Sequence, residues 1–185
     1  MCQYLLMLQL MSRDKLEKQK IIAITSIFII VIIVSFSLLN IYALGNLKLS
    51  GIDNKFRLFE MSTDDKIRIC NNSPIPAFFN QFVVLIYFED EPLGTFIVDS
   101  ATIMPNSGLD LEGNYISNSV AQSQSLFMHF DHMFSSDNTI RIDPRKMIIG
   151  TEFQTSIIGI PYSVSEQYTS FDFWNMLNSE NNLKC

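Results

Sequence analysis

An uninterrupted apolar run from Ile21 to Leu44 constrains this chain more than any other feature. The run contains no charged residue and is long enough to cross a hydrocarbon core of about 30 Å as a helix. A buried helix of this length would need protein on every side, which the rest of the chain can hardly supply. The sequence therefore predicts a cytoplasmic N-terminal segment over 1–20 and a transmembrane helix over 21–44.

Basic residues flank the apolar run unevenly. Four lie close together before it: Arg13, Lys15, Lys18 and Lys20. The basic residues after the run are more widely spaced, so the positive-inside rule places the N-terminus in the cytoplasm and the following domain outside the membrane. A cleaved signal peptide is the main alternative, but the apolar run is long for one and "YALGN" is a poor cleavage site. Whether Met1 or Met11 starts the chain stays open.

The chain beyond Gly45 is acidic, with 17 acidic and 9 basic residues. Nucleic acid binding is not expected, because phosphates require a basic surface. The expected partners are the lipid bilayer and a protein at the cell envelope. Cys70 and Cys185 would both lie outside the membrane and could pair. Two cysteines do not form a disulfide framework, however, and Cys185 ends a polar tail, so we expect free thiols.

The periodicity beyond the apolar run changes to two residues. Short β-rich runs follow one another, separated by turn residues: "KFRLFEM", "KIRIC", "FVVLIYF", "LGTFIV", "SGLDLEGNYI", "TIRIDPRKMII" and "TSIIGIPYSV". Seven such runs are typical of an immunoglobulin-like β-sandwich. The fold class is therefore mainly β, with a sandwich domain over 51–168 and a C-terminal tail over 169–185. The aromatic beginning of that tail is expected to dock on the domain.

The run "FVVLIYF" is apolar on both faces and needs cover on both. One helix could provide cover, because "SNSVAQSQSLFMHFDHMF" begins with possible N-capping residues and continues with apolar residues at helical spacing. We expect this helix over 119–134. The stretch "EDEPLG", before the next run, is expected to form a loop of about four to six residues.

A rigid, polar corner lies in "ICNNSPIPAFFNQF". Pro74 and Pro76 lack an amide hydrogen, so neither can sit inside a paired strand. Asn71 and Asn72 tolerate left-handed backbone and can bond to nearby amides. The strand that begins at Lys66 is therefore expected to end near Asn71.

The same stretch resembles the LEA14-like (LEA_2, or water stress and hypersensitive response) domain family. The matching residues are an asparagine, two prolines and a Leu-Gly pair: Asn72, Pro74, Pro76, Leu93 and Gly94. The resemblance extends loosely from about Gly51 to Val164 and includes membrane-anchored archaeal members. It implies a fibronectin-III-like sandwich with one helix and a binding or protective role rather than catalysis. The function we expect is therefore non-enzymatic: binding, envelope-structural or stress-protective. Ser73, which separates Asn72 from Pro74, and the aromatic tail depart from the family pattern.

The common enzyme signatures are absent from the sequence, so neither an enzyme nor a cofactor is expected. One alternative lies in "MHFDHM", where Met128, His129, His132 and Met133 could hold an ion. His129 and His132 are one helical turn apart, and thioether with imidazole suits copper outside the cytoplasm. The alternative hypothesis is thus a membrane-anchored copper-binding protein. The interpretation we prefer for these residues is packing and exposed helix positions.

Overall fold

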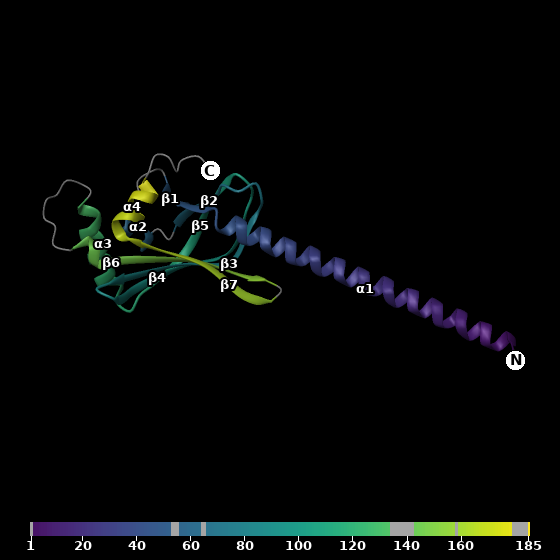
Figure 1. The fold of residues 1–185 in the computed structure, drawn as a ribbon. Coiled ribbons are helices and arrows are strands. Elements are labelled where there is room, and N and C mark those ends of the chain that lie inside the picture. The colour runs from purple at the N-terminus through teal and green to yellow at the C-terminus, as the bar shows by residue number, and fades with distance from the viewer. Residues whose placement is uncertain (1, 53–55, 64–65, 134–142, 158, 179–184) are drawn as a thin grey trace. The chain divides into compact units, whose positions relative to one another are not determined.

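The computed structural model describes residues 2–52, 56–63, 66–133, 143–157, 159–178 and 185 (Figure 1). The chain divides into two compact units, Met1–Leu38 and Leu39–Cys185. The first unit is part of a helix, and the second contains the sheet with its covering helices.

Helix α1 (Cys2–Leu44) contains the apolar run. Among the described residues, its part from Lys18 to Leu44 is long and apolar enough to cross a membrane. Large apolar side chains from Ile21 to Leu38 are exposed, as expected of a helix that contacts lipid. This helix could therefore anchor the protein in a membrane. Its last turns belong to the second unit, where Ala43 and Leu44 are buried.

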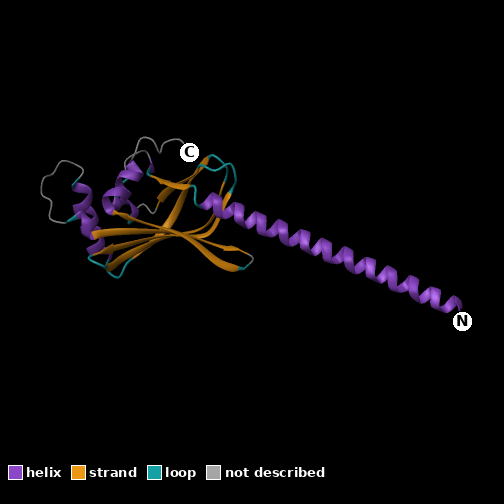
Figure 2. Ribbon diagram, in the orientation of Figure 1, coloured by secondary structure: helices purple, strands orange, loops and turns teal. Residues whose placement is uncertain are grey.

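Seven antiparallel strands form one curled sheet (Figure 2). The strands are β1 (Leu47–Ser50), β2 (Lys66–Asn71), β3 (Ala77–Phe88), β4 (Glu91–Ile103), β5 (Ser107–Ile116), β6 (Met147–Ile157) and β7 (Ile160–Thr169). Their order across the sheet is β1-β2-β5-β4-β3-β6-β7. The predicted mainly-β class is thus confirmed, and β1 and β7 form the two edges of the sheet.

Strand β5 lets the sheet curl, because its two halves pair with different neighbours. Residues Ser107 to Glu112 pair with β2, whereas Gly113 to Ile116 pair with β4. At Gly113 an added Cβ would lie 2.6 Å from the Phe96 ring, so only glycine permits this close approach. The curl brings β2 and β3 into one buried core.

The core lies against one face of β3. Phe82, Val84 and Ile86 are fully buried there, whereas Leu85 and Tyr87 on the opposite face are half-buried. The predicted strand is confirmed, but the two faces are covered unequally. Helix α3 (Val120–His132) adds its buried aromatic residues to the same cluster as Ile86. The predicted helix is therefore confirmed. It packs into the core on the buried face of β3.

Two short helical segments that precede β2 and β6 were not predicted. Helix α2 (Leu58–Met61) occupies most of "KFRLFEM", so the prediction of a strand there is wrong. The helix forms because the Asp131 carboxylate accepts hydrogen bonds from the backbone amides of Leu58 and Phe59. A 3-10 turn, η2 (Pro144–Lys146), precedes β6. It interrupts the predicted run "TIRIDPRKMII", of which residues 139–142 lie outside the described part of the chain.

Two turns also differ from expectation. The predicted strand "TSIIGIPYSV" is divided into the end of β6 and the start of β7, with Gly159 at a φ of 79° between them. Strand β4 begins as early as Glu91, so the predicted loop is a tight turn through Glu89 and Asp90, at φ of 52° and 69°. Two acidic residues thus adopt left-handed backbone, which a search for Gly-containing turns overlooks.

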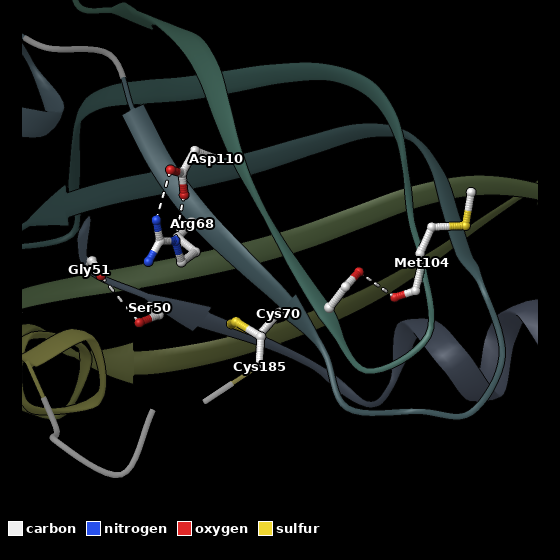
Figure 3. The surroundings of a disulfide bond; sticks show 8 residues. Ser50, Gly51, Arg68, Cys70, Met104, Asp110 and Cys185 are labelled. Carbon is white, nitrogen blue, oxygen red and sulfur yellow. Dashed lines mark hydrogen bonds and ion pairs between the residues drawn. A yellow bond between two sulfur atoms is a disulfide. The ribbon is translucent and has the colours of Figure 1, made fainter. Parts of the chain in front are cut away.

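Helix α4 (Ser170–Asn178) is the docked part of the tail and buries Phe173 and Leu177. The tail ends at Cys185, which forms a disulfide with Cys70 of β2 across a Cα–Cα distance of 5.1 Å. The expectation of free thiols is therefore wrong. Cys70 lies on the same face of β2 as Arg68, whose guanidinium binds both oxygens of Asp110 on β5 (Figure 3). Cys185 thus covers part of the face of β2 that the alternation of apolar and charged residues in this strand would assign to solvent.

Candidate functional site

A cavity of about 450 Å³ separates the two edges of the sheet. Strand β1 supplies one wall through Leu47, Lys48 and Leu49. Strands β6 and β7 supply the other, and Met176 of α4 contributes from the side. Because the sheet curls, two edge strands that are far apart in the order β1-β2-β5-β4-β3-β6-β7 come to line the same space.

Helix α4 closes only part of the gap between the edges. The amide of Gly51, just beyond β1, donates to the carbonyl of Leu177 at 2.9 Å. The side chain of Asn178 donates to the carbonyl of Phe56 at 3.1 Å, and the Phe56 ring meets that of Phe173 edge-on. The cavity remains where β1 begins, beside Leu44 and the turn that follows α1. A ligand would therefore enter next to the end of the apolar helix.

The cavity combines apolar and polar walls. Side chains of β6 and β7 with alternating numbers line it, because they share one face of the sheet: Thr151, Phe153, Val164, Glu166 and Tyr168. Leu47 and Leu49 add apolar surface opposite them, and Asn46 and Asn72 add amide groups. This composition is typical of sites that bind a molecule with an apolar body and a few polar groups.

Tyr168 and Glu166 interact on the polar wall of the cavity. The Tyr168 hydroxyl donates a hydrogen bond to the Glu166 carboxylate. Burial, together with this negatively charged partner, raises the pKa of Tyr168 above its ordinary range, so the phenol keeps its proton at physiological pH. The pair gives the cavity a carboxylate with a fixed orientation that can accept hydrogen bonds or face a cationic group on a ligand.

The predicted corner is held by Asn71, which is fully buried. Its amide nitrogen donates to the carbonyls of Ile75 at 2.7 Å and Ile103 at 3.0 Å. Its amide oxygen accepts from the Ser73 backbone amide at 3.0 Å and from the Ser73 hydroxyl at 2.7 Å. All of its donors and both oxygen lone pairs are used, so Asn71 replaces the ladder bonds that β2 gives up here. Strand β2 ends at Asn71, as predicted.

The other corner residues lie between β2 and β3. Pro74 and Pro76 are outside both strands, as their missing amide hydrogens require. Asn72 is exposed and lines the cavity between the sheet edges. The corner that suggested a family resemblance thus also forms part of the candidate site.

The Leu-Gly pair lies inside β4 and forms a β-bulge. The register between β3 and β4 shifts here, because Ile86 faces Gly94 whereas Tyr87 faces Pro92. Leu93 is the extra residue, and its carbonyl accepts hydrogen bonds from the hydroxyls of Ser117 at 2.5 Å and Ser123 at 3.2 Å. The bulge therefore fastens the beginning of α3 to the sheet.

Gly94 leaves room for an aromatic ring. A Cβ at this position would overlap the phenol of Tyr115, whose ring packs against Phe127 of α3 with centroids 5.8 Å apart. Burial raises the pKa of Tyr115, against the opposing effect of the nearby Ser123 and Ser117 hydroxyls. Leu93 and Gly94 thus act in helix attachment, and neither lines the cavity.

The stretch "MHFDHM" lies at the end of α3. Met128, His129 and His132 are exposed, whereas Met133 is half-buried against the core. The two methionines therefore do not share a face. No group of three or more histidine, cysteine or carboxylate side chains that could hold a metal ion occurs among the described residues. A copper site would have to rest on the two histidines and Met128, and it stays a prediction.

Asp131, inside that stretch, has a structural role that the sequence did not indicate. Its carboxylate caps α2 through bonds of 3.0 Å to the Leu58 amide and 2.9 Å to the Phe59 amide. Burial raises the pKa of Asp131 to about 6, although both amides and Arg57 favour the charged form. The carboxyl is therefore partly protonated at mildly acid pH.

The sequence matches no family model and no curated protein. Among solved structures it is similar to a crystal structure of a protein from Archaeoglobus fulgidus, with 11% identity and a TM-score of 0.30. The similarity covers 67% of this chain and 94% of that one. Candidate functions therefore have to be derived from the residues of this chain.

Proposed function

We propose that this chain is a single-pass membrane protein whose extracytoplasmic domain, a LEA14-like β-sandwich, works by binding rather than by catalysis. The observation that carries this proposal is the cavity between β1 and β7, which opens beside Leu44 at the end of the apolar helix. A molecule with an apolar body would contact Leu47, Phe153 and Val164, and its polar group would meet Glu166. A binding role of this kind agrees with an envelope-structural or stress-protective function.

Two observations support the extracytoplasmic location. Basic residues gather on the N-terminal side of the apolar run, which favours a cytoplasmic N-terminus. The disulfide between Cys70 and Cys185 favours an oxidising compartment for the domain, because thiols in the cytosol are usually kept reduced. Protease added to intact cells should therefore remove the C-terminal domain and spare the N-terminal segment. Protection of the domain would contradict this orientation.

A bulky side chain inside the cavity tests the binding site. Val164 lines the cavity, whereas its neighbour Ser165 is exposed and lies on the opposite face of β7. Val164→Trp should therefore fill the cavity, and Ser165→Trp should leave it open. Each protein would be extracted from its own membranes in polymer-bounded discs and weighed by native mass spectrometry.

We expect a bound small molecule on the wild-type protein and on Ser165→Trp, and its loss from Val164→Trp. A wild-type protein that carries no added mass would count against the cavity as a binding site. So would a Val164→Trp variant that retains the added mass. Circular dichroism of both variants shows whether the sheet is intact.

A further inference from the structure

The loops at the two ends of the sheet differ in charge. Three stretches contain no acidic or basic residue: 71–88, 100–109 and 153–165. By contrast, the turn between β3 and β4 contains Glu89 and Asp90, and it contacts η2, where Lys146 forms an ion pair with Glu89. Long charge-free stretches are unusual in a domain whose surface is otherwise acidic.

Hydrogen bonds and strand register bring one part of each charge-free stretch to the same end of the sheet. The amide of Asn106, in the turn after β4, donates to the Ser73 carbonyl in the corner after β2 at 3.2 Å. Ala77 at the start of β3 pairs with Ile103 at the end of β4. The third stretch joins them through Thr155 of β6, whose hydroxyl lies 3.3 Å from the amide nitrogen of Asn40. Asn40 also bonds to the backbone of Phe78 in β3, so its side chain joins the first and the third stretch.

Large apolar side chains are exposed at this charge-free end. Each of the three stretches contributes at least one: Phe78, Met104, Ile160 and Tyr162. Met104 is 62% exposed and Ile160 is 67% exposed. Phe78 lies near the start of β3, Met104 in the turn after β4, and Ile160 and Tyr162 at the start of β7, so a local packing defect in one loop does not explain their exposure. Together they offer an apolar rim to a partner that lacks charge.

The end of the membrane helix is bonded directly to this rim. The Asn40 side chain donates to the Phe78 carbonyl at 2.9 Å and accepts from the Phe78 amide at 2.8 Å. A helix rises 1.5 Å per residue, so a span that begins after Lys20 reaches Asn40 after about 30 Å. This distance matches the thickness of the hydrocarbon core of a bilayer. The backbone of Phe78 must therefore lie close to the membrane surface.

We infer that the charge-free end of the sheet rests on the bilayer and inserts Met104 and Ile160 into the boundary between headgroups and acyl chains. This inference rests on the proposed membrane anchoring through α1. The partner is a lipid surface of low net charge, because the acidic domain gains nothing from approaching anionic headgroups. Tyr162 suits the same lipid surface, because its hydroxyl can remain hydrated while its ring is buried among the headgroups. The charged turn at Glu89 then faces away from the membrane.

Fluorescence quenching tests this contact in the full-length chain. The protein would be reconstituted into vesicles of phosphatidylcholine whose acyl chains carry bromine, which quenches nearby tryptophan. Met104→Trp and Ile160→Trp report on the charge-free end. Met128→Trp is the matched control, because Met128 is also an exposed methionine but lies on α3, which is fastened to β4 at Leu93. The signal of Trp174, which all variants share, is subtracted with the unsubstituted protein.

We expect tryptophan at positions 104 and 160 to lose fluorescence on the order of twofold in brominated vesicles, because an aromatic side chain at the membrane interface lies next to the acyl chains. Tryptophan at position 128 should keep its intensity. Equal quenching at all three positions, or none at positions 104 and 160, would overturn the inference.

Flotation of the same vesicles separates this inference from the proposed function. A protein that floats with the vesicles but shows no contrast between positions 104 and 128 is anchored without resting on the bilayer. That result removes the inference and leaves the anchor. A protein that does not float overturns both.

Discussion

The two ends of the sheet are fastened by different chemistry. At the charge-free end, the neutral amides of Asn71 and Asn40 satisfy backbone donors and acceptors together. At the charged end, the ionisable carboxyl of Asp131 accepts from two amides of α2. An amide has both donors and acceptors and carries no charge, so it needs no water and no counter-ion. A change in pH should therefore affect the end of the domain that Asp131 holds, and it should leave the end that Asn71 and Asn40 hold unchanged.

Asn71→Asp places a charge at the neutral end and should lower the free energy of unfolding more than any other substitution considered below. The substitution replaces an amide that donates to Ile75 and Ile103 with a carboxylate that faces the same carbonyls in a fully buried site. We expect a loss on the order of 4 kcal/mol in the free energy of unfolding. Urea unfolding followed by circular dichroism measures it.

Asn72→Asp is the control for this loss, because its side chain is exposed and next to Asn71 in the sequence. It should change the unfolding free energy by less than about 0.5 kcal/mol. Equal losses for the two variants would mean that the bonds of Asn71 do not hold the corner.

The pH dependence of Asp131 is the second test. Its pKa is about 6 in the folded protein and 3.8 in the unfolded chain, so the folded state binds more protons between these values. Stability should therefore fall as the pH rises from about 4 to about 6, by an amount on the order of 2 kcal/mol. Asp131→Asn should flatten this slope in thermal melts across the same pH window.

Glu60→Gln is the companion variant, because Glu60 acts on Asp131 only as a nearby charge. It should keep most of the slope. A wild-type protein whose stability rises over this window would show that the amides of Leu58 and Phe59 outweigh burial. The raised pKa would then be wrong.

Asn40→Ala should have the smallest effect of the three. It removes the bonds to the Phe78 backbone at an exposed site, so we expect a loss on the order of 1 kcal/mol. Hydrogen exchange at the Phe78 amide is the sensitive measurement, because that amide donates to Asn40. Asn46→Ala removes only a bond to Tyr42 in the preceding turn and should leave the Phe78 amide unchanged. Similar exchange in both variants would exclude a fastening role for Asn40.

The sequence predicted the elements whose signal is local. Alternation located β2, charge-free apolar residues located β3, and helical spacing located α3 within about two residues of its observed bounds. The end of β2 at Asn71 followed from the prolines that come after it. In each case the residues that decide the structure are neighbours in the chain.

Features that depend on distant residues were missed. "KFRLFEM" alternates like a strand, but Asp131, more than 70 residues later, caps the amides of Leu58 and Phe59 and favours a helix. The disulfide likewise needs the tail to return to β2, and no spacing rule relates Cys70 to Cys185. The cavity could not be predicted, because it exists only when the curl brings β1 next to β7.

The disulfide has a mechanical consequence for a domain held by one helix. The bond from Cys70 to Cys185 closes a covalent ring of chain that contains every strand from β3 to β7, whereas β1 lies outside this ring. A force applied through helix α1 could therefore unravel only the chain between Gly45 and Cys70, roughly 85 Å when fully extended. Beyond that length the tension would pass into the sulfur–sulfur bond, so the ring would act as a stop that preserves the rest of the sheet under load.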